Sequence, residues 1–223
     1  MDFLSSLAAI VVIDLVLAGD NAIVIALAAR QLPPALQRRA VVWGTVGAVV
    51  VRASLTVGVL WLLQIPGLML AGGALLAWIG YRLLTGNDDG KGRDLAPAMG
   101  FWSAMRTIVI ADAVMGMDNV LAVAGAAHGS VLLVVIGLLI SIPIVVWGST
   151  LILKWLERVP SLVYVGGAVL AWTAASMIAG EPLVEAELAS RPVFRTLVYV
   201  AVIGGVLGLA MLKNRKPATE IAQ

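Results

Sequence analysis

The stretch DLVLAGDN at residues 14–21 recurs as DAVMGMDN at residues 112–119. Both copies lie inside apolar runs that are long enough to cross a bilayer, for which about 20 consecutive apolar residues are needed. A carboxylate at membrane depth is energetically costly, so it faces the protein interior or a water path and usually serves a function. The repeated stretch therefore predicts a membrane protein whose activity depends on the aspartates of the two copies.

The overall composition also indicates a membrane protein. Of the 223 residues, 61% are hydrophobic and 13% are charged, whereas soluble domains are about half apolar and about a quarter charged. We therefore expect an all-α membrane protein that has membrane lipids among its partners. The Lys and Arg residues are spread over short loops and form no continuous basic face, so nucleic acid is not an expected partner.

The residue types exclude several kinds of chemistry. The chain has no Cys and a single His, which excludes disulfides, catalytic thiols and the usual zinc or copper sites. We expect neither enzymatic activity nor an organic cofactor. Any bound ion must therefore be held mainly by oxygen atoms.

Apolar runs that are broken by Pro, Gly and charged residues predict seven transmembrane helices in a single membrane domain, residues 1–223. These helices cover residues 7–29, 40–63, 67–84, 107–127, 130–153, 161–179 and 195–212.

A second similarity extends the repeat beyond the aspartates. The sequence GGALLAW at 72–78 matches GGAVLAW at 166–172, which predicts repeat one at about 7–84 and repeat two at about 107–179. A cytoplasmic loop at about 85–106 joins the repeats, and the seventh helix, at about 195–212, stands outside them. Each repeat has an odd number of helices, so the second copy must run inverted across the membrane. Inverted repeats are typical of secondary transporters with a site at the bilayer midplane.

The charged loop residues predict the orientation in the plasma membrane. If the N-terminus lies outside and the C-terminus lies in the cytoplasm, only Arg191 and Arg195 are on the outer side. The cytoplasmic side then holds Arg30, Arg38, Arg39, Arg82, Lys91, Arg93, Arg106, Lys154, Arg158, Lys213, Arg215 and Lys216. This distribution follows the positive-inside rule.

We expect the two motifs to meet at the midplane, because a pseudo-two-fold axis would relate them. The pairs 20–21 and 118–119 fall near the centres of their helices and would hold an ion between them. Asp14 would lie toward the outer face, and Asp112 toward the cytoplasm. The predicted metal ligands are the acidic and amide residues of the motifs: Asp14, Asp20, Asn21, Asp112, Asp118 and Asn119.

Helix geometry sets a condition on Asp20. On a regular helix Asp14 and Asn21 share a face, whereas Asp20 is turned away from them by roughly 100°. Gly19 and Gly116 precede the two Asp-Asn pairs, and glycine permits an unwound backbone. A helix break at Gly19 would aim Asp20 inward and would free backbone carbonyls as further ligands.

Carboxylate, amide and carbonyl oxygens suit hard divalent cations such as Mn²⁺, Mg²⁺ and Ca²⁺. Met115 and Met117 flank the second Asp-Asn pair, and a thioether ligand would favour Mn²⁺, although packing explains such residues as well. A buried hydrogen-bond network or a proton relay without metal is the alternative interpretation of the aspartates.

Arg52 falls in the middle of the second predicted helix, and its counterpart in the fifth helix lies near Trp147. A buried Arg needs a carboxylate partner, and the nearest supply is the aspartates of the motifs. Arg52 is therefore predicted to be the charge partner of the acidic residues. The alternative is that its side chain extends to a membrane interface.

The two motifs, Asp-x-x-x-Ala-Gly-Asp-Asn and Asp-x-x-x-Gly-Met-Asp-Asn, resemble the paired signatures of the TerC family of integral membrane proteins. The resemblance covers essentially all of the chain to about residue 212. It implies a place in the wider LysE-type exporter group, export of Mn²⁺ from the cytoplasm and a historical link to tellurium resistance. The predicted ligands named above match the family's acidic membrane residues by motif position.

The sequence is thus interpreted as a divalent cation exporter of the plasma membrane, with Mn²⁺ as the transported ion and Ca²⁺ or Mg²⁺ as alternatives. Two other functions stay open: an exporter of small organic solutes, and a metal-binding membrane scaffold that does not transport and is linked to tellurium resistance. A homodimer through the seventh helix is a further expectation.

Overall fold

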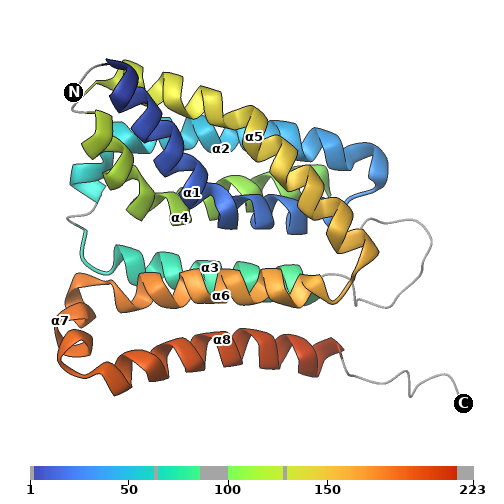
Figure 1. Ribbon diagram of the computed structural model, residues 1–223. Helices are drawn as coiled ribbons and strands as arrows, with labels where there is room; N and C mark the ends of the chain where they lie inside the picture. The colour runs from blue at the N-terminus through green and yellow to red at the C-terminus, as the bar shows by residue number, and fades with distance from the viewer. Residues whose placement is uncertain (1–2, 63–64, 86–99, 128–129, 215–223) are drawn as a thin grey trace, which may run out of the picture.

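The computed structural model describes residues 3–62, 65–85, 100–127 and 130–214, and all the regular structure in these residues is helical. The helices are α1 (Phe3–Arg30), α2 (Pro34–Leu62), α3 (Leu68–Thr85), α4 (Phe101–Ala127), α5 (Val131–Arg158), α6 (Leu162–Ala179), α7 (Pro182–Ser190) and α8 (Pro192–Asn214). The long helices run back and forth along a common direction, so that α1 and α8 begin at the same end of the molecule (Figure 1).

The long helices are arranged in layers (Figure 1). One layer is α8, which packs against α6 and α3. The next layer is the pair α3 and α6, and beyond it lie α1, α2, α4 and α5. Within this last group α1 packs mainly against α5, and α2 packs mainly against α4. The two motif helices, α1 and α4, also contact each other and run in opposite directions.

Glycines bring α3 and α6 into close contact. A Cβ atom added at Gly73 of α3 would lie 2.7 Å from the backbone oxygen of Ala174 in α6, closer than real Cβ atoms approach such an atom. A Cβ atom added at Gly167 of α6 would lie 2.6 Å from side-chain atoms of Leu84 in α3. Both glycines belong to the repeated Gly-Gly sequence, so each copy of it serves the same interface.

The four-helix group is held by a matching pair of contacts. Ile10 of α1 fills the space beside Gly137 of α5, and Ile108 of α4 fills the space beside Gly44 of α2. A Cβ atom added at Gly44 would lie 2.8 Å from Cδ1 of Ile108. Each isoleucine stands one helical turn before the first aspartate of its motif. This packing therefore fixes the position of both aspartates.

Within the described residues, four helices are long and apolar enough to cross a bilayer: α3, α5, α6 and α8. Helix α1 becomes a fifth when its segments Phe3–Val16 and Gly19–Arg30, which meet at an angle of 48°, are taken as one span. The described residues thus form a multi-pass, all-helical membrane protein. Helices α2 and α4 do not pass the same test over the described residues, so the count of seven spans stays a prediction.

Several helix ends differ from the predicted ranges. Helix α4 begins at Phe101, inside the predicted loop 85–106, because apolar packing continues there and Ala104 is fully buried. Residues 180–192, expected to be a connection, contain the short helix α7. Pro182 and Pro192 are the first residues of α7 and α8, a position where the missing N–H of proline is tolerated.

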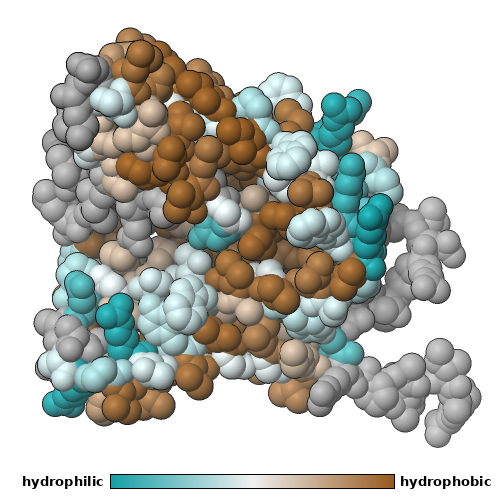
Figure 2. Space-filling model, in the orientation of Figure 1, coloured by the Kyte–Doolittle hydropathy of each residue, from teal (hydrophilic) through white to brown (hydrophobic). Residues whose placement is uncertain are grey.

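The outer surface is largely apolar. In Figure 2 hydrophobic side chains cover much of the visible face, and hydrophilic side chains gather mainly toward the two ends of the helices. Helix α8 is the extreme case, since only 11% of its apolar 18-residue stretch is buried inside the protein. Such a surface is suited to contact with lipid chains.

A buried carboxylate connects the C-terminal end of α6 to the N-terminal end of α3. Glu181, in the connection from α6 to α7, is 1% exposed and accepts hydrogen bonds from the backbone N–H groups of Gly67 (2.9 Å), Met69 (3.1 Å) and Leu70 (3.3 Å). Gly67 has a φ of 82°, which favours glycine. These hydrogen bonds stabilise the charged carboxylate and hold the pKa of Glu181 below its usual range, and the one from Gly67 contributes most.

An amide fastens the other end of the same pair. The side-chain nitrogen of Asn214, the last residue of α8, donates hydrogen bonds to the Leu84 carbonyl of α3 (3.3 Å) and to the Tyr164 hydroxyl of α6 (2.9 Å). Helix α8 is thereby tied to both helices of the adjacent layer.

Candidate cation site in the helical core

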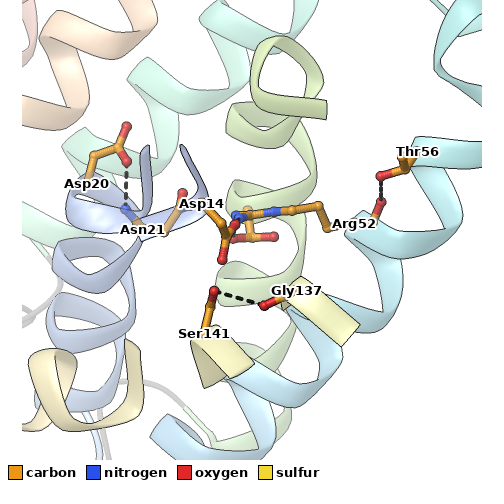
Figure 3. A network of polar contacts seen from close by, with 8 residues as sticks. Asp14, Asp20, Asn21, Arg52, Thr56, Gly137 and Ser141 are labelled. Carbon is orange, nitrogen blue, oxygen red and sulfur yellow. Dashed lines mark hydrogen bonds and ion pairs between the residues drawn. The ribbon is translucent and has the colours of Figure 1, made fainter. Parts of the chain in front are cut away.

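An ion-pair bridge lies at the centre of the four-helix group. The guanidinium of Arg52 on α2 contacts Asp14 of α1 through Nη1 and Asp112 of α4 through Nη2. All three residues are buried, with exposed fractions of 4%, 2% and 5% respectively. Figure 3 shows Arg52 extending from its helix to the carboxylate of Asp14. One arginine therefore joins the first aspartates of the two motifs.

The charges of this bridge do not balance. Two carboxylates face one guanidinium, so the ionised cluster carries one net negative charge in a buried environment. Removing one partner of a buried ion pair costs about 3–5 kcal/mol, because the other charge is left without compensation. Among the described residues, Oδ2 of Asp112 and Nε of Arg52 are buried without a hydrogen-bond partner. The site thus has unused capacity for a cation.

A small cavity adjoins the bridge. Its volume of about 20 Å³ leaves room for one particle of the size of a water molecule. The wall is built by α1, α2, α4 and α5, and so by both halves of the chain. Its polar side chains are Asp14, Asn21, Thr45, Arg52, Asp112 and Ser141, and the rest of the wall is apolar.

The structure separates Asp20 from this cavity. Asp14 and Asn21 both line the cavity, as their shared helix face predicts, whereas Asp20 lies on another side of α1 (Figure 3). Oδ1 of Asp20 accepts a hydrogen bond from the backbone N–H of Asn21 at 2.9 Å. Its Oδ2 is 3.5 Å from the hydroxyl of Thr173 on α6. The helical spacing that places Asp14 and Asn21 on one face turns Asp20 to another side, where it meets α6. The expectation that a break at Gly19 would aim Asp20 inward is therefore wrong, because α1 is bent there and Asp20 still does not line the cavity.

The second motif is described in part. Its backbone lies within α4, which is helical from Phe101 to Ala127 and passes through Gly116 without a break. The side chains of Asp118 and Asn119 lie outside the described residues. Over the side chains that are described, no group of three or more acidic or His residues is close enough together to hold a metal ion. Among the described side chains, Asp14 and Asp112 form the acidic pair at the centre of the site.

Two hydroxyl groups of the cavity wall are not among the site residues predicted from the sequence. Thr45 of α2 and Ser141 of α5 both line the cavity and are 1% and 0% exposed. Helical spacing carried a signal for Thr45, because it stands two turns before Arg52 and so shares its face. Ser141 shares a helix face with Val145, which also lines the cavity. Because Val145 is apolar, this spacing did not indicate a site in the sequence.

The methionines of the second motif do not line this cavity. Met115 is 4% exposed and belongs to the main apolar core of the protein. Met117 is likewise absent from the cavity wall. The described site therefore offers oxygen atoms and one guanidinium, without sulfur.

These features define a class: a multi-pass, all-helical membrane protein with a buried, negatively charged site between two repeated segments. The model of the integral membrane protein TerC family matches residues 1–218, and the chain belongs to that family.

Curated relatives agree with this assignment. The chain is 44% identical over 206 residues to the uncharacterized membrane protein YjbE of Bacillus subtilis (strain 168), covering 92% of this chain and 94% of that one. It is 26% identical over 177 residues to UPF0053 protein YegH of Escherichia coli (strain K12), covering 33% of that protein. It is also 24% identical over 175 residues to uncharacterized membrane protein YkoY of Bacillus subtilis, covering 54% of it. No solved structure matches the chain significantly.

Proposed function

We propose that this protein exports a divalent metal cation, Mn²⁺ in the first place, from the cytoplasm across the plasma membrane. The observation that carries the proposal is the bridge from Asp14 through Arg52 to Asp112, beside a cavity for one small particle. An ionisable cluster at membrane depth is costly and marks an ion pathway in many membrane proteins. The oxygen atoms around it are those that hard divalent cations prefer.

A divalent cation and the guanidinium of Arg52 compete for the same carboxylates. The two carboxylates carry two negative charges, which a divalent cation would neutralise in full and Arg52 neutralises by half. Binding of the cation therefore requires that Arg52 leave at least one aspartate. Because Arg52 joins α2 to α1 and α4, its release would loosen the contact between the two motif helices.

The proposal includes an inverted repeat of the kind found in LysE-type exporters. Its support is the opposite direction of α1 and α4, together with the matching Ile10–Gly137 and Ile108–Gly44 contacts. In such folds one repeat rocks against the other around a central site. The proposal also includes seven spans with the N-terminus outside. Asp20 and Asp118 would then bind the ion on either side of the central site as it crosses the membrane.

The size of the cavity favours an ion over an organic solute. A volume of about 20 Å³ holds one water-sized particle, whereas pockets for small organic ligands usually measure about 300–1,000 Å³. A scaffold that binds metal without transporting it would have the same cavity, so a flux measurement is needed to distinguish the two.

The test is ion flux through purified protein in liposomes that contain a Mn²⁺-quenched fluorophore. We expect wild-type protein to admit Mn²⁺, and the Asp112→Asn variant, which keeps the side-chain shape, to admit none above empty liposomes. Glu185→Gln is the matched control, because Glu185 is an exposed carboxylate of α7, and it should transport like the wild type. Mn²⁺ binding without flux would identify a scaffold, and flux of an amino acid without flux of Mn²⁺ would identify a solute exporter.

A further inference from the structure

Two hydroxyl groups share the cavity with the aspartates. Thr45 comes from α2 and Ser141 from α5, so each half of the chain supplies one of them. Neither side chain is exposed to solvent by more than 1%. Both lie in the wall that also contains Asp14 and Asp112.

Each of these hydroxyl groups donates its proton in a hydrogen bond to a backbone carbonyl of its own helix. Thr45 Oγ1 donates to the carbonyl of Val41 at 2.7 Å, and Ser141 Oγ donates to the carbonyl of Gly137 at 3.2 Å (Figure 3). A hydroxyl has one proton to donate and two lone pairs to accept with. With the proton turned to the helix backbone, the hydroxyl oxygen has only lone pairs left for a ligand. Such an oxygen suits a cation and does not suit an anion.

A second observation points to a ligand in the same place. Oδ2 of Asp112 is buried and has no hydrogen-bond partner among the described residues, and Asp112 itself lines the cavity. A buried carboxylate oxygen without a partner is costly unless something binds it. The cavity beside it has room for one water molecule or one small ion.

A cation that enters this cavity must lose most of its water. Hard divalent ions take six or more oxygen ligands, and the cavity is too small for a hydrated ion. Asp14, Asn21 and Asp112 offer carboxylate and amide oxygens. Without further protein oxygens, the ion would be left with an incomplete shell facing apolar side chains.

We propose that the hydroxyl oxygens of Thr45 and Ser141 bind the transported cation directly and complete its shell. The proposal rests on the proposed function, because it names further ligands of the same ion. It also bears on specificity: the described side chains of the cavity wall offer oxygen ligands and no sulfur, so hard divalent cations would be distinguished by size and not by affinity for a thioether.

The chain offers matched controls on α5. Ser149 is 0% exposed and donates to the carbonyl of Val145 at 2.7 Å, and Thr150 donates to the carbonyl of Val146 at 2.7 Å. Neither residue lines the cavity. Ser149→Ala and Thr150→Val therefore remove the same kind of backbone-bonded hydroxyl from the same membrane environment.

The experiment is equilibrium binding of Mn²⁺ to the full chain in detergent, with the free ion followed by its electron paramagnetic resonance signal. We expect Ser141→Ala and Thr45→Val each to raise the Kd for Mn²⁺ about tenfold, as expected for one lost contact to a charged group. Thr45→Ser, which keeps the hydroxyl, should bind like the wild type, and so should Ser149→Ala and Thr150→Val. Thermal unfolding without metal should be similar for Ser141→Ala and Ser149→Ala.

The outcomes separate this inference from the proposed function. If the wild type binds Mn²⁺ and both cavity variants bind it equally well, the hydroxyls are packing residues and the inference is wrong. Equal weakening in the Ser149→Ala and Thr150→Val controls would also overturn it. If the wild type itself does not bind Mn²⁺, Ca²⁺ or Mg²⁺, the proposed function fails, and this inference fails with it.

Discussion

The two halves of the chain share a framework but differ in charge. In each half, the isoleucine one turn before the motif packs against a glycine of the other half. Ile10 of α1 packs against Gly137 of α5, and Ile108 of α4 packs against Gly44 of α2. Counting the same number of residues onward from Gly44 and from Gly137 leads to Arg52 in the first half and to Val145 in the second. Both residues line the same cavity.

This difference determines the charge of the site. A valine at both positions would leave two buried carboxylates uncompensated, and an arginine at both would neutralise the cluster and leave no charge to attract a cation. One arginine compensates one of the two described carboxylates when both are ionised, and leaves the charge of the other to attract a cation. The repeat therefore supplies the framework, and its departure from symmetry at one position supplies the binding properties.

The largest expected effect comes from making the first half resemble the second. Arg52→Leu should destabilise the protein by about 3–5 kcal/mol, because Asp14 and Asp112 lose their common partner. Thermal unfolding in detergent measures this loss, and added Mn²⁺ should restore more stability to the variant than to the wild type. Arg82→Leu, at an exposed arginine of α3, is the control. An unchanged unfolding temperature for Arg52→Leu would contradict the role of the bridge.

Moving the arginine to the other half should have a smaller effect. The double variant Arg52→Val with Val145→Arg keeps the composition of the cavity and brings the guanidinium in from α5. We expect it to recover a measurable part of the stability lost in Arg52→Val alone, because a cation again lies beside both carboxylates. The comparison uses the same thermal unfolding measurement. A double variant less stable than Arg52→Val would show that the two positions are not equivalent.

The two aspartates of the first motif should differ in their effect on transport. Asp14→Asn should raise the Mn²⁺ concentration for half-maximal flux by about tenfold or more, because Asp14 lines the cavity. Asp20→Asn should change it less, since Asp20 faces Thr173 on α6. Thr173 matches Ile79 in the first half by sequence, so Thr173→Ile also tests whether this contact matters. Larger losses for Asp20→Asn than for Asp14→Asn would move the centre of the site to Asp20.

The smallest expected effect concerns Glu181, where the two halves also differ. Gly180-Glu181 in the second half corresponds to Gly86-Asn87 in the first. The pKa of Glu181 is lowered in the folded protein from an ordinary value of 4.5, first by the N–H of Gly67. Its charged form therefore adds stability above pH 4.5, and this contribution is lost as the pH falls through the lowered pKa. Glu181→Gln should unfold at a lower temperature than wild type at pH 7, with a difference that shrinks below pH 4.5. A difference independent of pH would contradict this account.

The sequence allowed part of the site to be predicted. The seven-residue spacing of Asp14 and Asn21 predicted their shared helix face, and the cost of a lone buried charge predicted that Arg52 pairs with carboxylates. The sequence could not show that Arg52 reaches both motifs at once, because that depends on how α2 packs against α4. Helix geometry turned Asp20 away from Asp14 and Asn21, but the sequence could not show that it meets Thr173, because that depends on how α6 packs against α1.

The fold was predictable to a similar extent. Long apolar runs gave the positions of the main helices, because such runs leave little choice of structure in a membrane. Helix α7 was missed, because it is only nine residues long and lies in an acidic stretch that was interpreted as a connection. The hydroxyls of Thr45 and Ser141 were missed because a single polar residue in an apolar run has many explanations until its neighbours are known.

The hydrogen bonds of Asn214 have a consequence for how the protein is made. Asn214 is the last residue of α8 and donates hydrogen bonds to the Leu84 carbonyl of α3 and the Tyr164 hydroxyl of α6. Both of these helices are synthesised before α8. A ribosome adds residues from the N-terminus onward, so these contacts cannot form until nearly the whole membrane part has been translated. The docking of α8 onto α3 and α6 through Asn214 is therefore a late step in the assembly of these helices.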